Sequence, residues 1–163
     1  MKIKVGIGYD VHKFSEEKTN THITLGGYKI PSERKIIAHS DGDLVLHAIT
    51  DSLLGAIGAG DIGYYFPPSE LKWKNADSKI FVKYALELIK EKKGTLNNVD
   101  IIIICESPKI NPHRDYIRNS LADILGLEID DVNVKATTVE KLGAIGREEG
   151  IACQAVACVT IYN

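Results

Sequence analysis

The sequence has few cysteines, little net charge and no long apolar run. Its three cysteines, Cys105, Cys153 and Cys158, lie in apolar strand-like segments without a C-x-x-C arrangement, so we expect free thiols in a reducing cytoplasm. A formal net charge of -2 predicts neither nucleic acid nor a membrane surface as a partner. No apolar run approaches the roughly 20 residues of a membrane span, and the first residues enter a strand pattern directly, so we expect no signal peptide.

Length and composition are those of one globular domain. The chain has 163 residues, of which 44% are hydrophobic and 26% charged, enough to bury a sizeable core. There is no repeat, no low-complexity segment and no GxxxxGK[ST] phosphate-binding motif. We therefore predict a single domain over residues 1–163.

The densest polar pattern lies in residues 38–63, AHSDGDLVLHAITDSLLGAIGAGDIG. It predicts an amphipathic helix with Ser40 or Asp41 as its N-cap, followed by a Gly-rich acidic turn. The apolar positions at helical spacing, which we expect to be buried, are Leu46, Ile49, Leu53 and Ile57. His47 lies off this stripe, so the helix offers a histidine to another part of the molecule.

His47 is one helical turn from both Asp43 and Asp51. We therefore expect a carboxylate of the same helix to orient its imidazole. Asp10 and His12 lie two apart on a predicted strand, so their side chains share a face. With His47 they form two histidines and one carboxylate, the ligand set of a catalytic zinc or similar divalent ion.

Two other histidines, His22 and His113, are rival metal ligands on sequence alone. Cationic and Gly-rich residues 141–147 form a candidate phosphate-facing loop. The apolar run 99–105 predicts a strand covered on both faces, and the rigid turn 106–112 lies at its carboxyl end, where open α/β sheets bind ligands.

The remaining pattern alternates helices with apolar strands. It predicts an α/β (α+β) fold: a mixed β-sheet with helices packed on one face, in a ferredoxin-like βαβ arrangement. The other predicted elements are a strand over 3–12, a hairpin over 21–31 turning at Gly26-Gly27, a loop over 64–77, a helix over 77–93 capped by Asp77, a helix with Asn111 and Pro112 at its start and Gly126 at its end, and strands over 132–139 and 151–161.

Several motifs stand in order along the chain: GYDVH at 8–12, AHSDGDLVLHAITDSLLGA at 38–56, GDIG at 60–63, SPK at 107–109, DVNVKATT at 131–138, EKLG at 140–143 and GREEGIAC at 146–153. With these motifs the whole chain resembles the 2-C-methyl-D-erythritol 2,4-cyclodiphosphate synthase family. The resemblance implies a phosphorus–oxygen lyase of the non-mevalonate (MEP) isoprenoid pathway. Its expected reaction closes 4-diphosphocytidyl-2-C-methyl-D-erythritol 2-phosphate into the cyclic diphosphate and releases CMP.

The resemblance also implies residue roles. Zn²⁺ is expected on Asp10, His12 and His47, and Mg²⁺ or Mn²⁺ on Glu140. His39 and Thr138 are expected to be catalytic, by stabilising the transition state. The expected substrate-binding residues are Asp10, Val11, His12, His39, Ser40, Asp61, Ile62, Gly63, Phe66, Pro67, Pro68, Ser69, Glu70, Cys105, Glu106, Ser107, Pro108, Lys109, Ile110, Asn111, Thr137, Thr138, Val139, Glu140, Ala144 and Arg147.

Within this set the resemblance assigns separate parts of the substrate to separate segments. Residues 105–111 line the cytidine pocket, and residues 61–63 hold the methylerythritol hydroxyls under a loop that starts at Phe66. The family is a cytoplasmic homotrimer whose sites lie between subunits, with an apolar cavity at the trimer axis that is a candidate isoprenoid site. This chain departs from many relatives at Pro68, Glu70, Val139 and Ala144, which bears on the shape of the lid and of the axial cavity.

Two alternatives fit part of the pattern. A zinc phosphoester hydrolase would use the same Asp10, His12 and His47 with His39 as general base, and it would give an open-chain product. A non-catalytic trimer would bind an isoprenoid or nucleotide without turnover, and loss of Thr138 would leave it unaffected.

Overall fold

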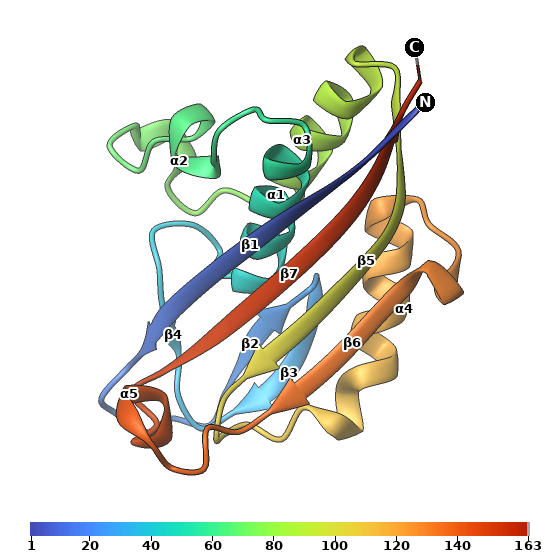
Figure 1. The fold of residues 1–163 in the computed structure, drawn as a ribbon. Coiled ribbons are helices and arrows are strands. Elements are labelled where there is room, and N and C mark those ends of the chain that lie inside the picture. Colours follow the sequence, from blue (N-terminus) through green and yellow to red (C-terminus); the bar gives the residue numbers. More distant parts are fainter. Residues whose placement is uncertain (163) are drawn as a thin grey trace.

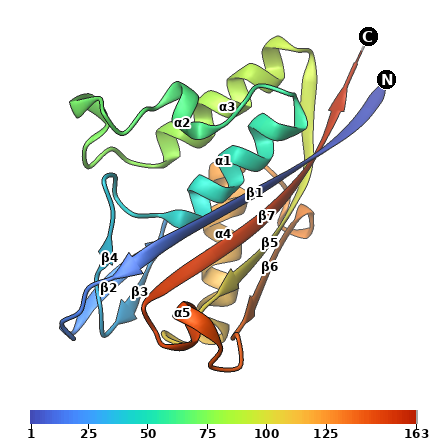
Figure 2. The same ribbon diagram turned by 60° about the vertical axis from the view of Figure 1, so that its left-hand side comes forward.

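The computed structural model, which describes residues 1–162, is a curved sheet with a layer of helices on one face (Figures 1 and 2). Five strands pair in the order β4-β1-β7-β5-β6, and β2 and β3 form a separate hairpin. The strands are β1 (Lys2–Phe14), β2 (Thr21–Leu25), β3 (Tyr28–Ser32), β4 (Ile36–Ile37), β5 (Gly94–Ile104), β6 (Val132–Thr137) and β7 (Gly150–Ile161). The helices are α1 (Leu44–Ala56), α2 (Ile62–Tyr65), α3 (Lys79–Glu91), α4 (Arg114–Leu125) and α5 (Gly143–Gly146).

The predicted mixed sheet with helices on one face is confirmed. Strands β5 and β6 are parallel and joined through α4, which is the expected βαβ unit, whereas β7 runs antiparallel to both β1 and β5. Apart from the two-residue strand β4 and the four-residue helix α5, the strands of the main sheet and the helical segments between them follow one another as βαβαββ. This succession differs from the βαββαβ order of ferredoxin-like folds.

Strand β1 is present where the alternation predicts it, and it turns its apolar side chains away from the helices. Ile3, Val5 and Ile7 are 67%, 63% and 63% exposed, while Gly6 and Gly8 are buried against α1. A Cβ atom at Gly8 would lie 1.9 Å from the carbonyl oxygen of Ala48. The absence of a side chain at these two glycines therefore allows α1 to lie directly on the backbone of β1.

The polar segment before α1, residues 39–43, differs in detail from the prediction. The N-cap is Asp43, not Ser40 or Asp41: its Oδ1 accepts the N–H of Leu46 at 3.2 Å. The same carboxylate also accepts the N–H groups of Gly26 and Gly27 at 2.8 and 2.7 Å. These two glycines have φ of +60° and +79°, as the predicted hairpin turn requires, so Asp43 fastens the hairpin to the helix.

The stripe predicted for α1 is confirmed, since Leu46, Ile49, Leu53 and Ile57 are all buried. Helix α3 begins after Asp77, whose Oδ1 accepts the N–H of Lys79 at 2.9 Å. Asn111 and Pro112 do not start α4. They lie in a separate 3-10 turn, Asn111–His113, and α4 begins at Arg114.

Strand β5 is covered on one face only. Ile101 and Ile103 are buried beneath the helices, whereas Ile102 and Ile104 on the other face are partly exposed. The expectation of cover on both faces is therefore wrong for one copy of the chain. Together with the apolar side chains of β1, this leaves an apolar face of the sheet without helices.

The three cysteines are free, as expected, with Cys105 and Cys153 buried. Within residues 1–162 no helix combines the length and the apolar character that a membrane crossing needs.

The contact between β1 and α1 gives a direct stability prediction. Gly8→Ala forces the strand and the helix apart, because the new Cβ would lie 1.9 Å from a carbonyl oxygen, and we expect the free energy of unfolding to fall by about 3 kcal/mol. Gly55→Ala is the matched control: the nearest atom to its Cβ is 3.7 Å away, and Ala within a helix should stabilise by about 0.5–1 kcal/mol. Denaturant unfolding measures both. A Gly8→Ala protein as stable as the parent would contradict the close contact.

Candidate functional site

Asp10, His12 and His47 form one cluster at the junction of β1 and α1. Asp10 and His12 lie on the same face of β1 as Gly8, and the close approach of α1 brings His47 to them. One ligand atom from each residue lies within 4.8 Å of the others. The Oδ2 atom of Asp10 is 2.9 Å from Nδ1 of His47 and 3.4 Å from Nδ1 of His12. The structure thus assembles the three side chains that the sequence proposed as ligands.

The chemistry of this cluster fits a divalent ion. Two imidazoles and one carboxylate, each partly buried with side-chain exposures of 12%, 14% and 26%, leave room for a fourth ligand from outside the protein. Within residues 1–162 it is the single group of three or more His, Cys, Asp or Glu side chains gathered in this way.

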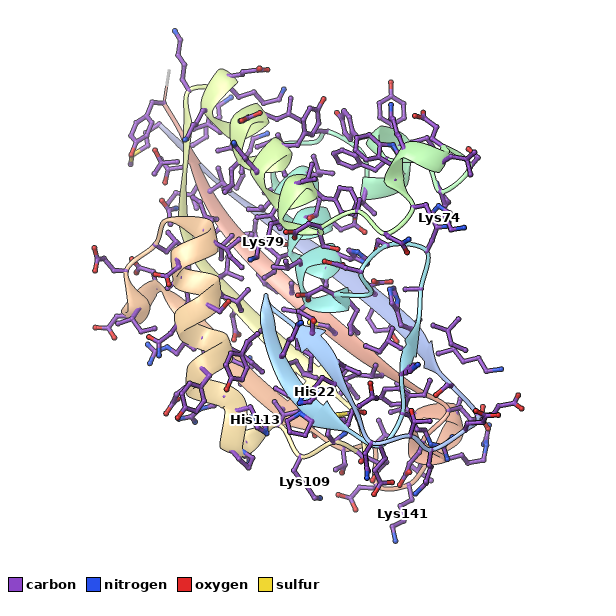
Figure 3. All side chains as sticks on the ribbon, turned by 180° about the vertical axis from the view of Figure 1, so that it is seen from behind. His22, Lys74, Lys79, Lys109, His113 and Lys141 are labelled. Carbon is purple, nitrogen blue, oxygen red and sulfur yellow. The ribbon has the colours of Figure 1, made fainter. Side chains whose placement is uncertain are left out.

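The rival histidines do not belong to the cluster. Figure 3 shows His22 on β2 and His113 just before α4. In that view both lie far from Lys79, the residue next to Ser78, and Ser78 contacts His47. The two rivals are therefore not part of the Asp10 cluster.

The groups that orient His47 are not those expected from its own helix. The carboxylate of Asp43 is occupied with backbone N–H groups, and Oδ1 of Asp51 accepts the N–H of Ile62 at 2.8 Å. Burial raises the pKa of Asp43 to about 6 and also raises the pKa of Asp51. The Nε2 atom of His47 instead contacts Ser40 Oγ at 3.1 Å and Ser78 Oγ at 2.8 Å. The expectation of an orienting carboxylate on α1 is therefore wrong.

His12 and His47 of the cluster line a pocket of about 300 Å³. Of the expected substrate-binding residues, His12, His39, Ser40, Ile62, Gly63, Phe66 and Pro68 line this pocket. Trp73 and Phe81 also line it, and sequence reasoning missed both. Phe66 packs against Phe81 and Trp73, with ring centroids 4.5 and 4.9 Å apart. The single tryptophan in a proline-bounded loop was the signal that could have identified this apolar wall.

A second pocket, of about 150 Å³, lies at the carboxyl ends of the parallel strands β5 and β6, as the turn over 106–112 predicts. Its lining from the expected set is Cys105, Glu106, Pro108, Lys109, Ile110, Asn111, Thr137 and Thr138, and Ala136 adds to it. Burial raises the pKa of the Cys105 thiol to about 12, so this group is a neutral wall of the pocket and not a nucleophile.

Glu106, which lines the second pocket, anchors the loop after β6 by hydrogen bonds. Oε1 of Glu106 accepts the N–H groups of Val139 and Lys141 at 3.0 and 3.2 Å. Between them Glu140 has a φ of +54°, and Lys141 follows at +60°, a strained backbone for residues with side chains. The loop that carries Thr138 and Glu140 is therefore fixed by a carboxylate of the neighbouring strand end.

Several expected residues line neither pocket. Val11 points to the opposite face of β1 and is 51% exposed, and its amide donates to Asp10 Oδ1 at 2.9 Å. The Asp61 carboxylate caps α2, accepting the N–H of Tyr64 at 2.9 Å. Arg147 pairs with Glu149 at 2.6 Å. The remaining members outside both pockets are Asp10, which belongs to the cluster, and Pro67, Ser69, Glu70, Ser107, Val139, Glu140 and Ala144.

The two pockets share no lining residue. Figures 1 and 2 place α2, beside the first pocket, at a different end of the molecule from the tips of β5 and β6. Figure 3 agrees, with Lys74 and Lys109 far apart. One copy of the chain therefore presents two separate concave surfaces.

Known proteins resemble this chain over nearly its full length. It is 51% identical to the 2-C-methyl-D-erythritol 2,4-cyclodiphosphate synthase of Ehrlichia canis, over 98% of this chain and 94% of that protein. It is 54% identical to the bifunctional enzyme IspD/IspF of Bartonella bacilliformis over 96% of this chain, but it spans only 39% of that longer protein. The CDP complex of IspF from Plasmodium falciparum has a TM-score of 0.85 at 39% identity, over 99% of this chain and 97% of that one.

The family relationship is equally extensive. The family match runs over residues 3–160 and so includes the Asp10 cluster and the linings of both pockets. Together with the identity to the Ehrlichia canis protein, it shows that this chain belongs to the YgbB family.

Proposed function

We propose that this chain converts 4-diphosphocytidyl-2-C-methyl-D-erythritol 2-phosphate to 2-C-methyl-D-erythritol 2,4-cyclodiphosphate and CMP, in the non-mevalonate route to isoprenoids. The observation that carries the proposal is the Asp10–His12–His47 cluster, which opens into a pocket in a chain that matches a cyclodiphosphate synthase over nearly its whole length. The lyase class follows from the same relationship.

The proposed reaction is an intramolecular phosphoryl transfer. An oxygen of the 2-phosphate forms a bond to the β-phosphorus, the bond from that phosphorus to the bridging oxygen breaks, and CMP leaves with the electron pair. No water is consumed. Such a transfer requires mainly alignment and charge stabilisation from the protein. Aligning both ends of one flexible molecule can lower a barrier by about 7–11 kcal/mol.

Two metal sites are part of the proposal. Asp10, His12 and His47 would hold Zn²⁺, the ion that two imidazoles and one carboxylate suit best, and Glu140 would hold Mg²⁺ or Mn²⁺, which prefer oxygen ligands. When bound, these ions would supply positive charge that screens the repelling phosphates. Glu106 holds the backbone on both sides of Glu140 and so fixes the point from which the Glu140 side chain extends.

In this proposal, different parts of the substrate bind in the two pockets. We assign the cytidine to the pocket at the ends of β5 and β6, and the methylerythritol to the apolar pocket beside the cluster. There the segment 61–63 would hold its hydroxyls beneath a lid of residues 66–70. His39 and Ser40 would contact its phosphates. Thr138, followed by Val139, Ala144 and Arg147, would lie along the diphosphate, and His39 and Thr138 would stabilise the transition state.

A homotrimer is proposed from the apolar sheet face and from the separation of the pockets. Ile3, Val5, Ile7 and Tyr9 are each more than half exposed, and side chains of this kind in one row are typical of a subunit interface. A neighbouring copy could bring the pocket of one chain to the cluster of the next. The cavity at the trimer axis would be apolar and could hold an isoprenoid. The three free thiols support a cytoplasmic location.

Product analysis tests the proposed reaction. Purified protein, loaded with zinc and supplied with Mg²⁺ and the cytidylyl substrate, is followed by phosphorus NMR. We expect the cyclic diphosphate and CMP in equal amounts, loss of turnover with a zinc chelator, and recovery when zinc is restored. An open-chain phosphate product would favour a hydrolase, and absence of turnover in zinc-loaded protein would favour a non-catalytic binding protein.

The first metal site has its own test. His47→Ala removes one of three protein ligands, so we expect the zinc content to fall below a tenth of the parent's and kcat to fall by about 10³-fold. The control is His22→Ala, a histidine outside the cluster, which should keep full zinc and activity. Metal analysis and sedimentation are measured together, and both variants should remain trimers. Full zinc in His47→Ala would contradict the assignment.

Glu140→Gln tests the second metal. The amide has no charge to offer an Mg²⁺ ion, so the Mg²⁺ concentration for half-maximal activity should rise about tenfold or more, a loss near 1.4 kcal/mol of binding free energy. Zinc content should stay unchanged. Glu128→Gln, an exposed carboxylate before the opposite end of β6, is the matched control. An identical Mg²⁺ titration in Glu140→Gln and parent would remove Glu140 from the site.

A further inference from the structure

Ser78 occupies an unusual position at the start of α3. It stands at the N-cap position, yet its side chain makes no capping hydrogen bond, because the Asp77 carboxylate accepts the N–H of Lys79 instead. Ser78 is completely buried and lines neither the cluster pocket nor the β5–β6 pocket. Its hydroxyl lies 2.8 Å from Nε2 of His47. It is therefore free of the usual capping role and in contact with a candidate metal ligand.

The Ser78 hydroxyl already donates its proton to Asp41. Ser78 donates both its hydroxyl O–H and its backbone N–H to the two carboxylate oxygens of Asp41, the N–H at 2.9 Å. Asp41 also accepts the N–H of Asp43 at 3.1 Å. Since a carboxylate can only accept, the Ser78 hydroxyl can meet His47 only as an acceptor.

This direction of donation puts a proton on Nε2 of His47, which it donates to Ser78. Nδ1 faces Asp10, at 2.9 Å from its Oδ2. Because a carboxylate can only accept, Nδ1 also carries a proton in that contact, and a metal bound between the two atoms would take the place of that proton. The Ser78 contact therefore keeps the proton of the neutral, metal-binding imidazole on Nε2 and leaves Nδ1 to the metal.

We propose that Ser78, fixed by Asp41, is a positioning residue that holds His47 as the Nε2–H tautomer with Nδ1 ready to bind the metal. The inference rests on the zinc centre of the proposed function and adds the pair that orients one of its ligands. Such outer hydrogen bonds typically contribute 10- to 100-fold to metal affinity. Ser40 is a weaker candidate, since its hydroxyl lies farther from Nε2, at 3.1 Å, and it lines the pocket where substrate would compete for it.

The two residues also explain how the site depends on the fold. Asp41 precedes α1 and Ser78 precedes α3, so the hydrogen bonds between these residues, which are 37 apart along the chain, join the segments that lead into the two helices. A shift of either helix start would move the acceptor away from Nε2. The metal ligand is thus oriented from outside its own helix.

Zinc affinity, measured by competition with a chromophoric chelator, tests the proposal. Ser78→Ala removes the acceptor, and Asp41→Asn lets the hydroxyl donate to Nε2, which favours the wrong tautomer without opening a cavity. We expect both variants to bind zinc 10- to 100-fold more weakly than the parent. Ser52→Ala is the matched control: this serine is equally buried in α1, but its hydroxyl bonds only to the carbonyl of Ile49, so its zinc affinity should equal the parent's.

A second readout separates positioning from a merely structural role. Long-range proton–nitrogen NMR of histidine-labelled, zinc-loaded parent should show His47 protonated on Nε2 and ligating through Nδ1. The reverse tautomer, or parent-like zinc affinity in a folded Ser78→Ala or Asp41→Asn protein, would overturn the proposal. A parent that binds no zinc would instead contradict the metal centre on which the proposal rests, and circular dichroism establishes that each variant is folded.

Discussion

The close contact between α1 and the glycine face of β1 is the constraint on which the site depends. Gly6 and Gly8 let the helix rest on the strand backbone, with the carbonyl oxygens of Ser52 and Ala48 where side chains would otherwise stand. Asp10 and His12 continue the same face of β1, so this contact brings them to His47. A helix held farther away by even one methyl group would leave the three donor atoms too far apart to share an ion.

Carboxylates near the chain turns add the finer positioning. Asp43 joins the hairpin turn to α1, Asp41 joins the starts of α1 and α3, and Glu106 fixes the loop that carries Glu140. Each accepts backbone N–H groups from a segment distant in the sequence. Hydrogen bonds to a charged acceptor are stronger than neutral ones, so a few such side chains can hold loops that have little apolar packing of their own.

The sequence predicted most of the fold and the central ligands, for identifiable reasons. Period-two alternation places Asp10 and His12 on one face, and helical spacing turns His47 away from the buried stripe, so these three could be grouped in advance. The alternation of β1 does not say which face meets the helices. Gly6 and Gly8 determine the face that packs on the helix, because only a strand face without side chains allows the backbone of α1 to come so close. The sequence alone does not show which helix packs there.

Other features depend on contacts that no local pattern encodes. Ser78 has the position of an ordinary helix cap, and its contact with His47 joins residues 31 apart. The N-cap of α1 is Asp43 because its carboxylate also reaches the hairpin turn. Trp73 and Phe81 line the pocket because the loop folds back over α3, and β5 is half-exposed because the apolar sheet face has no cover within one chain.

Anomalous diffraction at the zinc absorption edge, from crystals of the purified protein, tests the central claim most directly. The account predicts a zinc ion in each chain, bound by Asp10, His12 and Nδ1 of His47 at about 2.0–2.2 Å, with Ser78 still within hydrogen-bond distance of Nε2. An anomalous peak on His22 or His113 with none at the cluster would contradict it, as would a cluster that stays without metal in zinc-saturated crystals.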